Sequence, residues 1–491
     1  MRVLFLTSEL CNFIKTGGLA DVAKALPLEL ARRGHDIRIM LPCYAKIPNW
    51  NSLPVVGEFS LSNAHNSTSI AYKVREGRLN NTITVWLIEH EYYFGRNNLY
   101  AENNVAYPDN GERFAFFCAA CLQTVEQFNF KPDIVHCNDW HTALTPMLLK
   151  LRYGSSPFFA GTKSVLTVHN GAFQGIFDRG QLWMLPELAR TNNDSITHGY
   201  ANLNFLKCGV FYADKINAVS PSYAEELTTF LGGHGMAQNY MARADDLCGI
   251  VNGCDYTDWD PKMDNTIPFH FSADHMGNKY LCKCLLQETT SLPVCDVPIF
   301  GMVCRLTSQK GVNLLLPILK DFLQHRIQLI LIGTGDPELE KNLSAIAEDY
   351  PERFVFKSVY DNNLAHLIEA GADFFLMPSI FEPCGLNQMY SLAYGTLPIV
   401  RAVGGLKDTV VCYDDDKENA TGFIFHEPEP GALLSCLRRV LIFFLQEPQE
   451  VQRIRHNAMH SRYEWKNSAE EYELMYYSAL QKIKQFALAK T

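Results

Sequence analysis

Residues 1–22 read MRVLFLTSELCNFIKTGGLADV. The apolar run 3–6 is typical of a buried strand, and residues 19–32 carry apolar side chains at helical spacing. Between them Gly17 and Gly18 form a turn, with Lys15 two residues ahead. A strand, a glycine turn and a helix predict the start of a doubly wound α/β domain. The turn would let backbone N–H groups approach an anion at the start of the helix, with Lys15 as a mobile cation; a tight turn beside a surface lysine is the alternative.

The alternation of apolar runs and amphipathic segments continues along the chain and then restarts. The predicted strands are residues 3–6, 37–41, 85–88, 134–136, 165–168 and 216–219, followed by 300–303, 329–332, 354–356, 374–377 and 398–400. The predicted helices are residues 19–32, 112–128 and 222–230, followed by 311–323, 337–348, 363–370 and 386–394. Near-continuous apolar strands between helices indicate parallel sheets covered on both faces. We therefore predict an α/β chain of two doubly wound, Rossmann-like domains.

Charge, glycine and proline cluster at residues 244–259, where the pattern restarts. We place the first domain at residues 1–247 and the second at 248–464, with a central cleft between them. Residues 465–491 have aromatic and apolar side chains at helical spacing, with Asn467 or Ser468 as the expected N-cap. This tail helix is expected to pack back on the first domain; an oligomer contact is the alternative.

Composition limits the classes of partner. The 491 residues include 43 Lys and Arg against 53 Asp and Glu, a net charge of −10, which excludes nucleic-acid binding driven by bulk charge. The 15 cysteines are an odd number spread over a long chain, which favours reduced thiols of the cytoplasm over a disulfide scaffold. The apolar runs are too short for a signal peptide or a membrane helix. We expect a cytoplasmic protein without a nucleic-acid or membrane partner; the oligomeric state cannot be inferred.

Polar residues follow two predicted strands of the first domain. Asp139 lies shortly after strand 134–136, and His169 and Asn170 follow strand 165–168. The carboxyl ends of parallel strands meet at one edge, so these side chains are expected at one ligand crevice rather than in unrelated structural hydrogen bonds. The histidines around Asp139 could suggest a metal, but no helical HExxH motif is present, so we expect none.

The second domain has cations at a corresponding position. Arg305 and Lys310 follow strand 300–303 and precede a helix, which suits a diphosphate; an exposed surface pair is the alternative. Glu382 follows strand 374–377 and could accept hydrogen bonds from sugar hydroxyls. The turns at Tyr394-Gly395-Thr396 and at residues 403–410 are expected on the same edge.

Taken in order, these motifs resemble the family of bacterial glycogen synthases and plant starch synthases. The matching segments are SEL (8–10) with KTGGLADV (15–22), YPDNGERFAFF (107–117), HCNDWH (136–141), TVHNGAFQG (167–175), NAVSPSYAEEL (217–227), VNGCDYTDWDP (251–261), RLTSQKG (305–311), FEPCGL (381–386), YGTLPIVRAVGGLKDTV (394–410) and TGFIF (421–425). The resemblance covers nearly the whole chain and implies the GT-B type of glycosyltransferase, with two Rossmann domains.

The resemblance implies transfer of glucose from ADP-glucose to the non-reducing end of an α-1,4-glucan, with retention at the anomeric carbon and without a metal or other cofactor. It implies catalytic roles for Glu382, Arg305, Lys310, His169 and Asp139. It implies, with the turns described above, substrate contacts for Lys15, Gly17, Gly18, Asn170, Asn252, Cys384, Gly385, Leu386, Tyr394 and Thr396. Asn138 stands where a histidine is common in the family, but no charged donor contact is lost.

Three alternatives stay open at this point. The first is a transferase of the same fold that uses UDP-glucose or another acceptor. The second is a phosphorylase, which bound pyridoxal phosphate would reveal. The third, from a different class, is a non-catalytic glucan-binding protein, which would be expected to have lost Lys15, Arg305, Lys310 or Glu382; all four are present.

Overall fold

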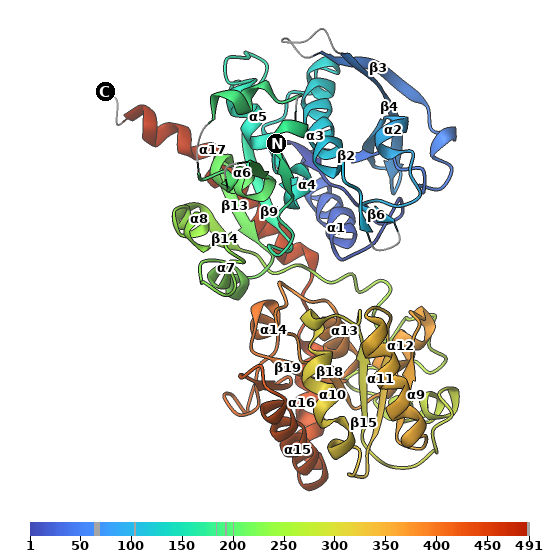
Figure 1. The fold of residues 1–491 in the computed structure, drawn as a ribbon. Helices are drawn as coiled ribbons and strands as arrows, with labels where there is room; N and C mark the ends of the chain where they lie inside the picture. Colours follow the sequence, from blue (N-terminus) through green and yellow to red (C-terminus); the bar gives the residue numbers. More distant parts are fainter. Residues whose placement is uncertain (63–68, 103–104, 183, 192–193, 200, 489–491) are drawn as a thin grey trace. The chain divides into compact units, whose positions relative to one another are not determined.

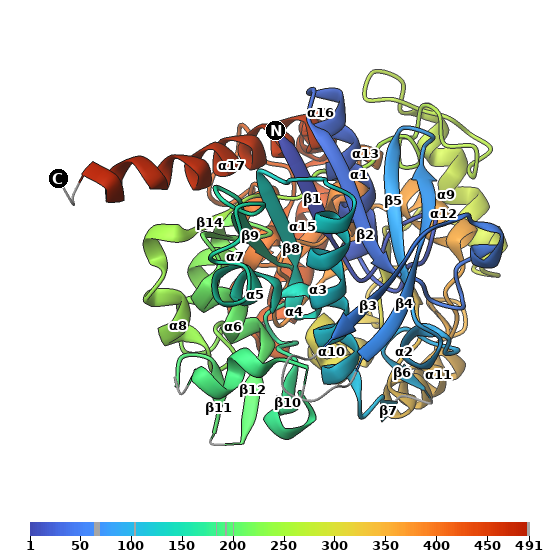
Figure 2. The ribbon, with the colours of Figure 1, turned by 90° about the horizontal axis from the view of Figure 1, so that it is seen from above.

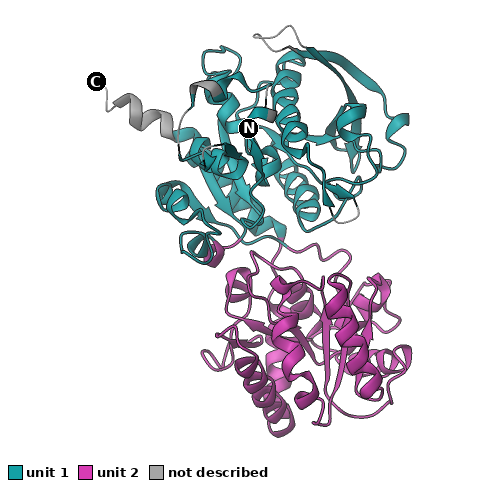
Figure 3. Cartoon of the chain, viewed as in Figure 1, with its two compact units in different colours: residues 1–219, 224–253, 465–491 teal, residues 220–223, 254–464 magenta. Residues whose placement is uncertain are grey.

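The computed structural model describes residues 1–62, 69–102, 105–182, 184–191, 194–199 and 201–488. The chain forms two compact units (Figures 1 and 3). Unit 1 contains Met1–Val219, Ala224–Gly253 and Trp465–Thr491, and unit 2 contains Ser220–Tyr223 and Cys254–Glu464. Among the described residues no helix is long and apolar enough to cross a membrane.

Unit 1 is built on one large, mostly parallel sheet (Figure 2). In spatial order its described strands are β14 (Leu247–Gly249), β13 (Lys215–Ala218), β9 (Lys163–Val168), β8 (Ile134–Asn138), β1 (Arg2–Leu6), β2 (Asp36–Pro42), β5 (Ile83–Glu89), β4 (Ser69–Leu79) and β3 (Val55–Ser62). The run from β14 to β5 is parallel, and β4 and β3 add an antiparallel edge. Chain order reverses between β1 and β8, as in the doubly wound fold.

Helices cover this sheet because its central strands are apolar on both faces. Every residue of β8 is buried, as are the last four of β1. The described helices of unit 1 are α1 (Leu19–Arg32), α2 (Glu91–Phe94), α3 (Asn110–Gln127), α4 (Asp139–Thr142), α5 (Thr145–Leu151), α6 (Phe205–Tyr212), α8 (Ala237–Met241) and α17 (Trp465–Leu488), with α7 (Pro221–Leu227) shared between the units. A small sheet of β10 (Ile176–Asp178), β12 (Asn202–Asn204) and β11 (Thr197–His198) follows the β9 loop.

The tail helix α17 belongs to unit 1, as predicted, where it packs against α1 and β9. It begins at Trp465, which places the N-cap at residue 464, so the expected N-cap at Asn467 or Ser468 is wrong by three or four residues. Its buried Tyr476 hydroxyl lies 2.7 Å from Nδ1 of His136 on β8. The Tyr472 hydroxyl accepts a hydrogen bond of 2.9 Å from Asn217 on β13. These fully buried polar contacts fix the helix to the sheet in one register.

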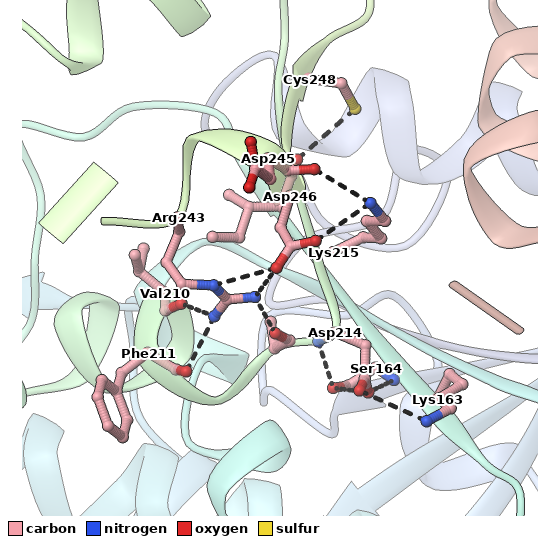
Figure 4. Close-up of polar contacts among 12 residues, drawn as sticks. Lys163, Ser164, Val210, Phe211, Asp214, Lys215, Arg243, Asp245, Asp246 and Cys248 are labelled. Carbon is pink, nitrogen blue, oxygen red and sulfur yellow. Dashed lines mark hydrogen bonds and ion pairs between the residues drawn. The ribbon is translucent and has the colours of Figure 1, made fainter. Parts of the chain in front are cut away.

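A charged network ties the amino ends of β9 and β13 together (Figure 4). Asp214 accepts hydrogen bonds from the amide and hydroxyl of Ser164 at 2.8 and 3.0 Å, and Lys163 lies 3.7 Å away. Beside it Asp246 pairs with Arg243 at 2.9 Å and with Lys215 at 3.1 Å. Arg243 also donates to three carbonyls at the end of α6, those of Val210, Phe211 and Ala213. The network lies at the sheet edge opposite to the carboxyl ends.

Unit 2 is a second, fully parallel sheet. The described strands run in the order β17 (Phe354–Lys357), β16 (Gln328–Ile332), β15 (Ile299–Val303), β18 (Phe374–Met377), β19 (Leu397–Arg401) and β20 (Phe423–Phe425). In chain order this is 3-2-1-4-5-6, the order of a dinucleotide-binding fold, with the switch between β15 and β18. The predicted α/β class with two Rossmann-like domains is therefore confirmed.

Alternate residues of these strands supply two cores, one on each face. Phe300, Met302 and Leu329 belong to one buried cluster, whereas Ile299 and Ile330 belong to the other. The covering helices are α9 (Gly277–Thr289), α10 (Val312–Phe322), α11 (Pro337–Asp349), α12 (Asn362–Gly371), α13 (Asn387–Tyr394), α14 (Gly404–Thr409), α15 (Pro430–Gln446) and α16 (Pro448–His460).

Candidate active site

In each unit the candidate residues follow the two strands between which the strand order reverses. In unit 1 the loop with Lys15 follows β1, and Asp139 follows β8. In unit 2 Arg305 and Lys310 follow β15, and Glu382 follows β18. Open α/β sheets bind ligands at this position because the loops diverge there and leave a crevice.

The loop after β1 is organised by Glu9, which lies in the matching SEL segment but to which the sequence motifs assigned no role. One carboxylate oxygen of Glu9 accepts from the amides of Thr16 and Gly17 at 2.6 and 3.0 Å. Lys15 is exposed and pairs with Asp21 on α1 at 2.7 Å. The Gly17 amide thus donates within the protein, and the exposed residues of the loop are Lys15, Thr16 and Gly18, the N-cap of α1.

Asp139 has a left-handed backbone (φ 54°), which is uncommon for a residue with a side chain. Its Oδ1 atom accepts from the backbone amides of His169 at 2.7 Å and Asn170 at 3.3 Å, so it joins the carboxyl ends of β8 and β9. Burial raises the pKa of Asp139 to about 7, although the two amides and their partial positive charge oppose this shift. The predicted convergence of Asp139, His169 and Asn170 is present in the structure.

The imidazole of His169 is held by Asn138. Nε2 of His169 lies 2.9 Å from Oδ1 of Asn138, whose Nδ2 donates to the carbonyl of Leu6. Because Oδ1 can only accept, Nε2 of His169 carries the hydrogen and Nδ1 is left as an acceptor. Burial lowers the pKa of His169 to about 3, so the ring is neutral near pH 7. Asn138, which stands where a histidine is common in the family, thus supplies the acceptor that fixes the tautomer of His169.

Asn252 follows β14 and is buried, and its Oδ1 atom has no hydrogen-bond partner within the described part of the chain. A buried polar atom without a hydrogen-bond partner costs free energy. Oδ1 of Asn252 can therefore accept a hydrogen bond from a ligand without breaking one within the protein. No contact between Asn252 and Asp139 or His169 is found among the described residues.

In unit 2 the predicted charges meet directly. Nζ of Lys310 lies 2.6 Å from Oε2 of Glu382, and Ser379 donates to the same oxygen at 3.0 Å. Glu382 is 5% exposed, and the guanidinium of Arg401 binds the carbonyls of Ser379 and Ile380 just before it. Arg305 is exposed and has no ion-pair partner among the residues described. This edge therefore combines one fixed cation–carboxylate pair with one cation available to a ligand.

Glycines bring the backbone of this site into close contact. Gly311 has φ 71° and a Cβ there would lie 1.8 Å from the carbonyl oxygen of Pro378. Gly404 has φ 41° and a Cβ there would lie 2.0 Å from the carbonyl oxygen of Glu382. Only glycine fits at such positions, so the loops after β15, β18 and β19 pack as one assembly.

The FEPCGL segment lies beside this pair. Cys384 is buried, and its carbonyl and that of Gly385 accept from Nε2 of Gln388 at 3.0 and 3.2 Å. Gly385 has φ 78°, and Leu386 is the N-cap of α13 and partly exposed.

Two predicted substrate residues lie elsewhere. Tyr394 ends α13 and Thr396 precedes β19, so both are at the amino edge of the sheet, opposite to Glu382. Both are fully buried; the Tyr394 hydroxyl donates to Asp264 at 2.5 Å, and Thr396 accepts from Lys279 at 2.7 Å. The prediction that this turn shares the edge of the site is wrong, because a turn from a helix into a parallel strand lies at the strand's amino end.

Comparisons with known proteins agree with this architecture. Residues 2–241 match the family described as starch synthase catalytic domain, and residues 291–460 match glycosyl transferases group 1. A glycogen synthase of Aeromonas hydrophila is 55% identical over 480 residues, which cover 98% of each chain. A glycogen synthase of Vibrio parahaemolyticus is 52% identical over 483 residues, covering 98% of this chain and 99% of that one.

Solved structures of related enzymes have the same fold. The catalytic domain of starch synthase IV from Arabidopsis thaliana, bound to ADP and acarbose, has a TM-score of 0.88 at 28% identity and covers 98% of this chain and 99% of that one. A sucrose-phosphate synthase from Thermosynechococcus elongatus, at 16% identity and a TM-score of 0.58, shares the fold.

The chain has two Rossmann-like units, each with charged residues at its switch point, and it matches two glycosyltransferase families. These features define a glycosyltransferase of the GT-B class. The identity of more than half over almost the full length then narrows the class. The chain belongs to the glycogen synthase family.

Proposed function

We propose that this protein transfers glucose from ADP-glucose to the non-reducing end of an α-1,4-glucan, with retention, in glycogen synthesis. The ion pair between Lys310 and Glu382, next to the exposed Arg305, carries the proposal. The Arabidopsis relative bound to ADP and acarbose, a donor product and a glucan-like ligand, supports the two substrates. The 15 cysteines, free throughout, support the cytoplasm as the compartment.

The principal task of such an enzyme is to stabilise the departing diphosphate. Arg305 offers a planar fork of N–H donors, which suits two phosphate oxygens, and Lys310 has three donors, of which Glu382 uses one. Charge that develops on the leaving oxygen is then met by cations already in position, so little reorganisation is needed. We assign the diphosphate to Arg305 and Lys310, with Lys15 as a further cation, and require no metal.

Glu382 is assigned to the donor sugar. Its carboxylate is buried and held by Lys310 and Ser379, so it presents a fixed acceptor for sugar hydroxyls. Cys384, Gly385 and Leu386 form the adjoining loop, whose backbone lies at the start of α13.

Asp139, His169, Asn170 and Asn252 are assigned to the glucose in unit 1. A neutral His169, whose Nε2 hydrogen is donated to Asn138, offers Nδ1 as an uncharged acceptor for a sugar hydroxyl. Retention of configuration at the anomeric carbon needs one of two routes. Either two displacements occur in succession, or the acceptor attacks from the same face from which the leaving group departs. No carboxylate here stands out as a covalent nucleophile, so we favour same-face attack, with the departing phosphate taking the proton of the acceptor 4-hydroxyl.

A transfer assay with radiolabelled ADP-glucose or UDP-glucose, with glycogen as acceptor, tests the proposal. We expect incorporation from ADP-glucose, and proton NMR of the product should show α-1,4 linkages. Preference for UDP-glucose would favour the first alternative. Glucose 1-phosphate as the better donor, with absorbance from pyridoxal phosphate, would indicate a phosphorylase. Glucan binding without transfer from any donor would refute an enzymatic role.

The Lys310→Ala variant tests the assigned site. Loss of one preorganised cation should lower kcat by about 10²- to 10³-fold while the protein remains folded. Lys320→Ala is the matched control, because Lys320 lies in the same unit and its ion pair with Asp349 is exposed. Equal rates for the two variants at saturating donor would overturn the assignment of Lys310.

A further inference from the structure

Glu9 is a buried carboxylate at the carboxyl end of β1, outside the set of residues to which a role was assigned above. It is 5% exposed although it lies in a loop. Oε2 accepts from the Thr16 and Gly17 amides at 2.6 and 3.0 Å, and Oε1 accepts from the Thr16 hydroxyl at 2.6 Å and the Tyr100 hydroxyl at 2.9 Å. Four donors thus converge on one side chain, so both of its oxygens are satisfied within the protein.

These contacts close the loop between β1 and α1. Thr16 and Gly17 stand directly before Gly18, the N-cap of α1, and no side chain caps that helix end. A carboxylate that accepts amides at this place also balances the partial positive charge of the helix start. Removing Glu9 would leave two backbone amides without their partner and release a segment that contains two glycines.

The loop in question carries Lys15. Its position depends on the backbone of residues 15–18, because its own ion pair with Asp21 is about half exposed and by itself weak. The Glu9 carboxylate is therefore the main buried anchor of a loop whose exposed cation is assigned to the donor.

We propose that Glu9 is a positioning residue, which holds the Lys15–Gly18 loop in the conformation that binds the donor and does not itself contact substrate. The proposal rests on the function proposed above. It deepens that function by naming the residue that fixes the conformation of the loop, since the four hydrogen bonds leave the carboxylate with no free acceptor direction toward a ligand.

This geometry makes a specific forecast for Glu9→Gln. The amide oxygen can keep the place of Oε2 and accept from the two backbone amides. The NH2 group then faces the Thr16 and Tyr100 hydroxyls, which can turn and accept from it, because a hydroxyl is both donor and acceptor. Gln therefore preserves the loop while it removes the charge, whereas Ala removes both.

The test compares Glu9→Ala and Glu9→Gln in the full-length protein. For Glu9→Ala we expect kcat/KM for ADP-glucose to fall by about 30- to 100-fold, mainly through a higher KM for the donor, with the KM for glycogen nearly unchanged. Glu9→Gln should stay within about threefold of the wild type. Glu58→Ala, at an exposed pair with Lys73 in the same unit, is the control and should match the wild type.

A second readout does not depend on activity. Trypsin cleaves after Lys15, so the rate of cleavage between Lys15 and Thr16, followed by mass spectrometry, reports the order of the loop. Cleavage should be faster in Glu9→Ala and unchanged in Glu9→Gln. If Glu9→Ala does not fold, Thr16→Val, which removes one of the four bonds, should give a smaller change in the same direction.

The outcomes separate the two proposals. Wild-type protein without transfer from ADP-glucose would refute the proposed function, while the cleavage rates would still decide the role of Glu9. A Glu9→Ala variant with normal kinetics and normal cleavage would overturn the positioning role. A Glu9→Gln variant as impaired as Glu9→Ala would also overturn it, because the charge rather than the loop geometry would then matter.

Discussion

Gly404→Ala is the substitution whose effect on turnover and stability the structure lets us estimate most directly. Gly404 has φ 41°, and a Cβ there would lie 2.0 Å from the carbonyl oxygen of Glu382. Real Cβ contacts are not shorter than 3.0 Å, so the Glu382 backbone must move by about 1 Å. The left-handed backbone costs about another 1–2 kcal/mol for a residue with a side chain.

The consequence should appear in both rate and stability. A displacement of about 1 Å at a group that orients substrate costs about 10²-fold in turnover. The strain of about 1–2 kcal/mol should lower the Tm of unit 2 by about 2–8 °C. We would measure kcat and KM for ADP-glucose on glycogen, and Tm by scanning calorimetry.

Gly431→Ala is the matched control. Gly431 lies in the first turn of α15 in the same unit, and a Cβ there would meet nothing within 4 Å. Its rate should equal that of the wild type, and its stability should be unchanged or slightly higher, because alanine favours helix. A Gly404→Ala enzyme within threefold of the wild-type rate would refute the argument that this close approach positions Glu382.

Two further predictions concern unit 1. Burial raises the pKa of Asp139 from 3.8 to about 7, so between these values the folded protein holds a proton that the unfolded chain has released, and the free energy of unfolding falls as pH rises. In Asp139→Asn this contribution is absent, and the Tm of the variant relative to the wild type should rise between pH 4 and 7; a constant difference would contradict the shift. Asp214→Ala should cost about 3 kcal/mol in denaturant unfolding, because the Ser164 amide and nearby lysines lose their partner. Asp349→Ala, at an exposed pair, should cost less than about 1 kcal/mol, and equal costs for the two would count against the network.

The parallel strands were the most predictable part of the fold. Most are apolar on both faces, so a run such as residues 374–377 stands out from its neighbours, and the structure has β18 with those bounds. The hairpin of β3 and β4 was missed because it is an exposed edge: β4 contains Lys73, Arg75 and Arg78 and reads as polar. An antiparallel edge has one solvated face, so its signal is weak.

The site was predictable where residues follow strands. Lys310 and Glu382 are 72 positions apart in sequence, yet both follow strands that neighbour at the switch point, and they form an ion pair. The turn at Tyr394-Gly395-Thr396 misled because glycine marks turns at either edge of a sheet. Glu9 lies in the matching SEL segment, but its contacts could not be predicted, since they depend on the amides of residues 16 and 17, which no side-chain spacing reveals.

The division of unit 1 along the chain has a consequence for biosynthesis. β1 is made first and lies inside the sheet, whereas α17, which covers α1 and β9, is made last. Unit 2 lies almost wholly between them and can close its own six strands while α17 is still to be translated. A ribosome therefore completes the second unit before the first, and a nascent chain that stops before Trp465 exposes the apolar surface under α17 to chaperones and proteases.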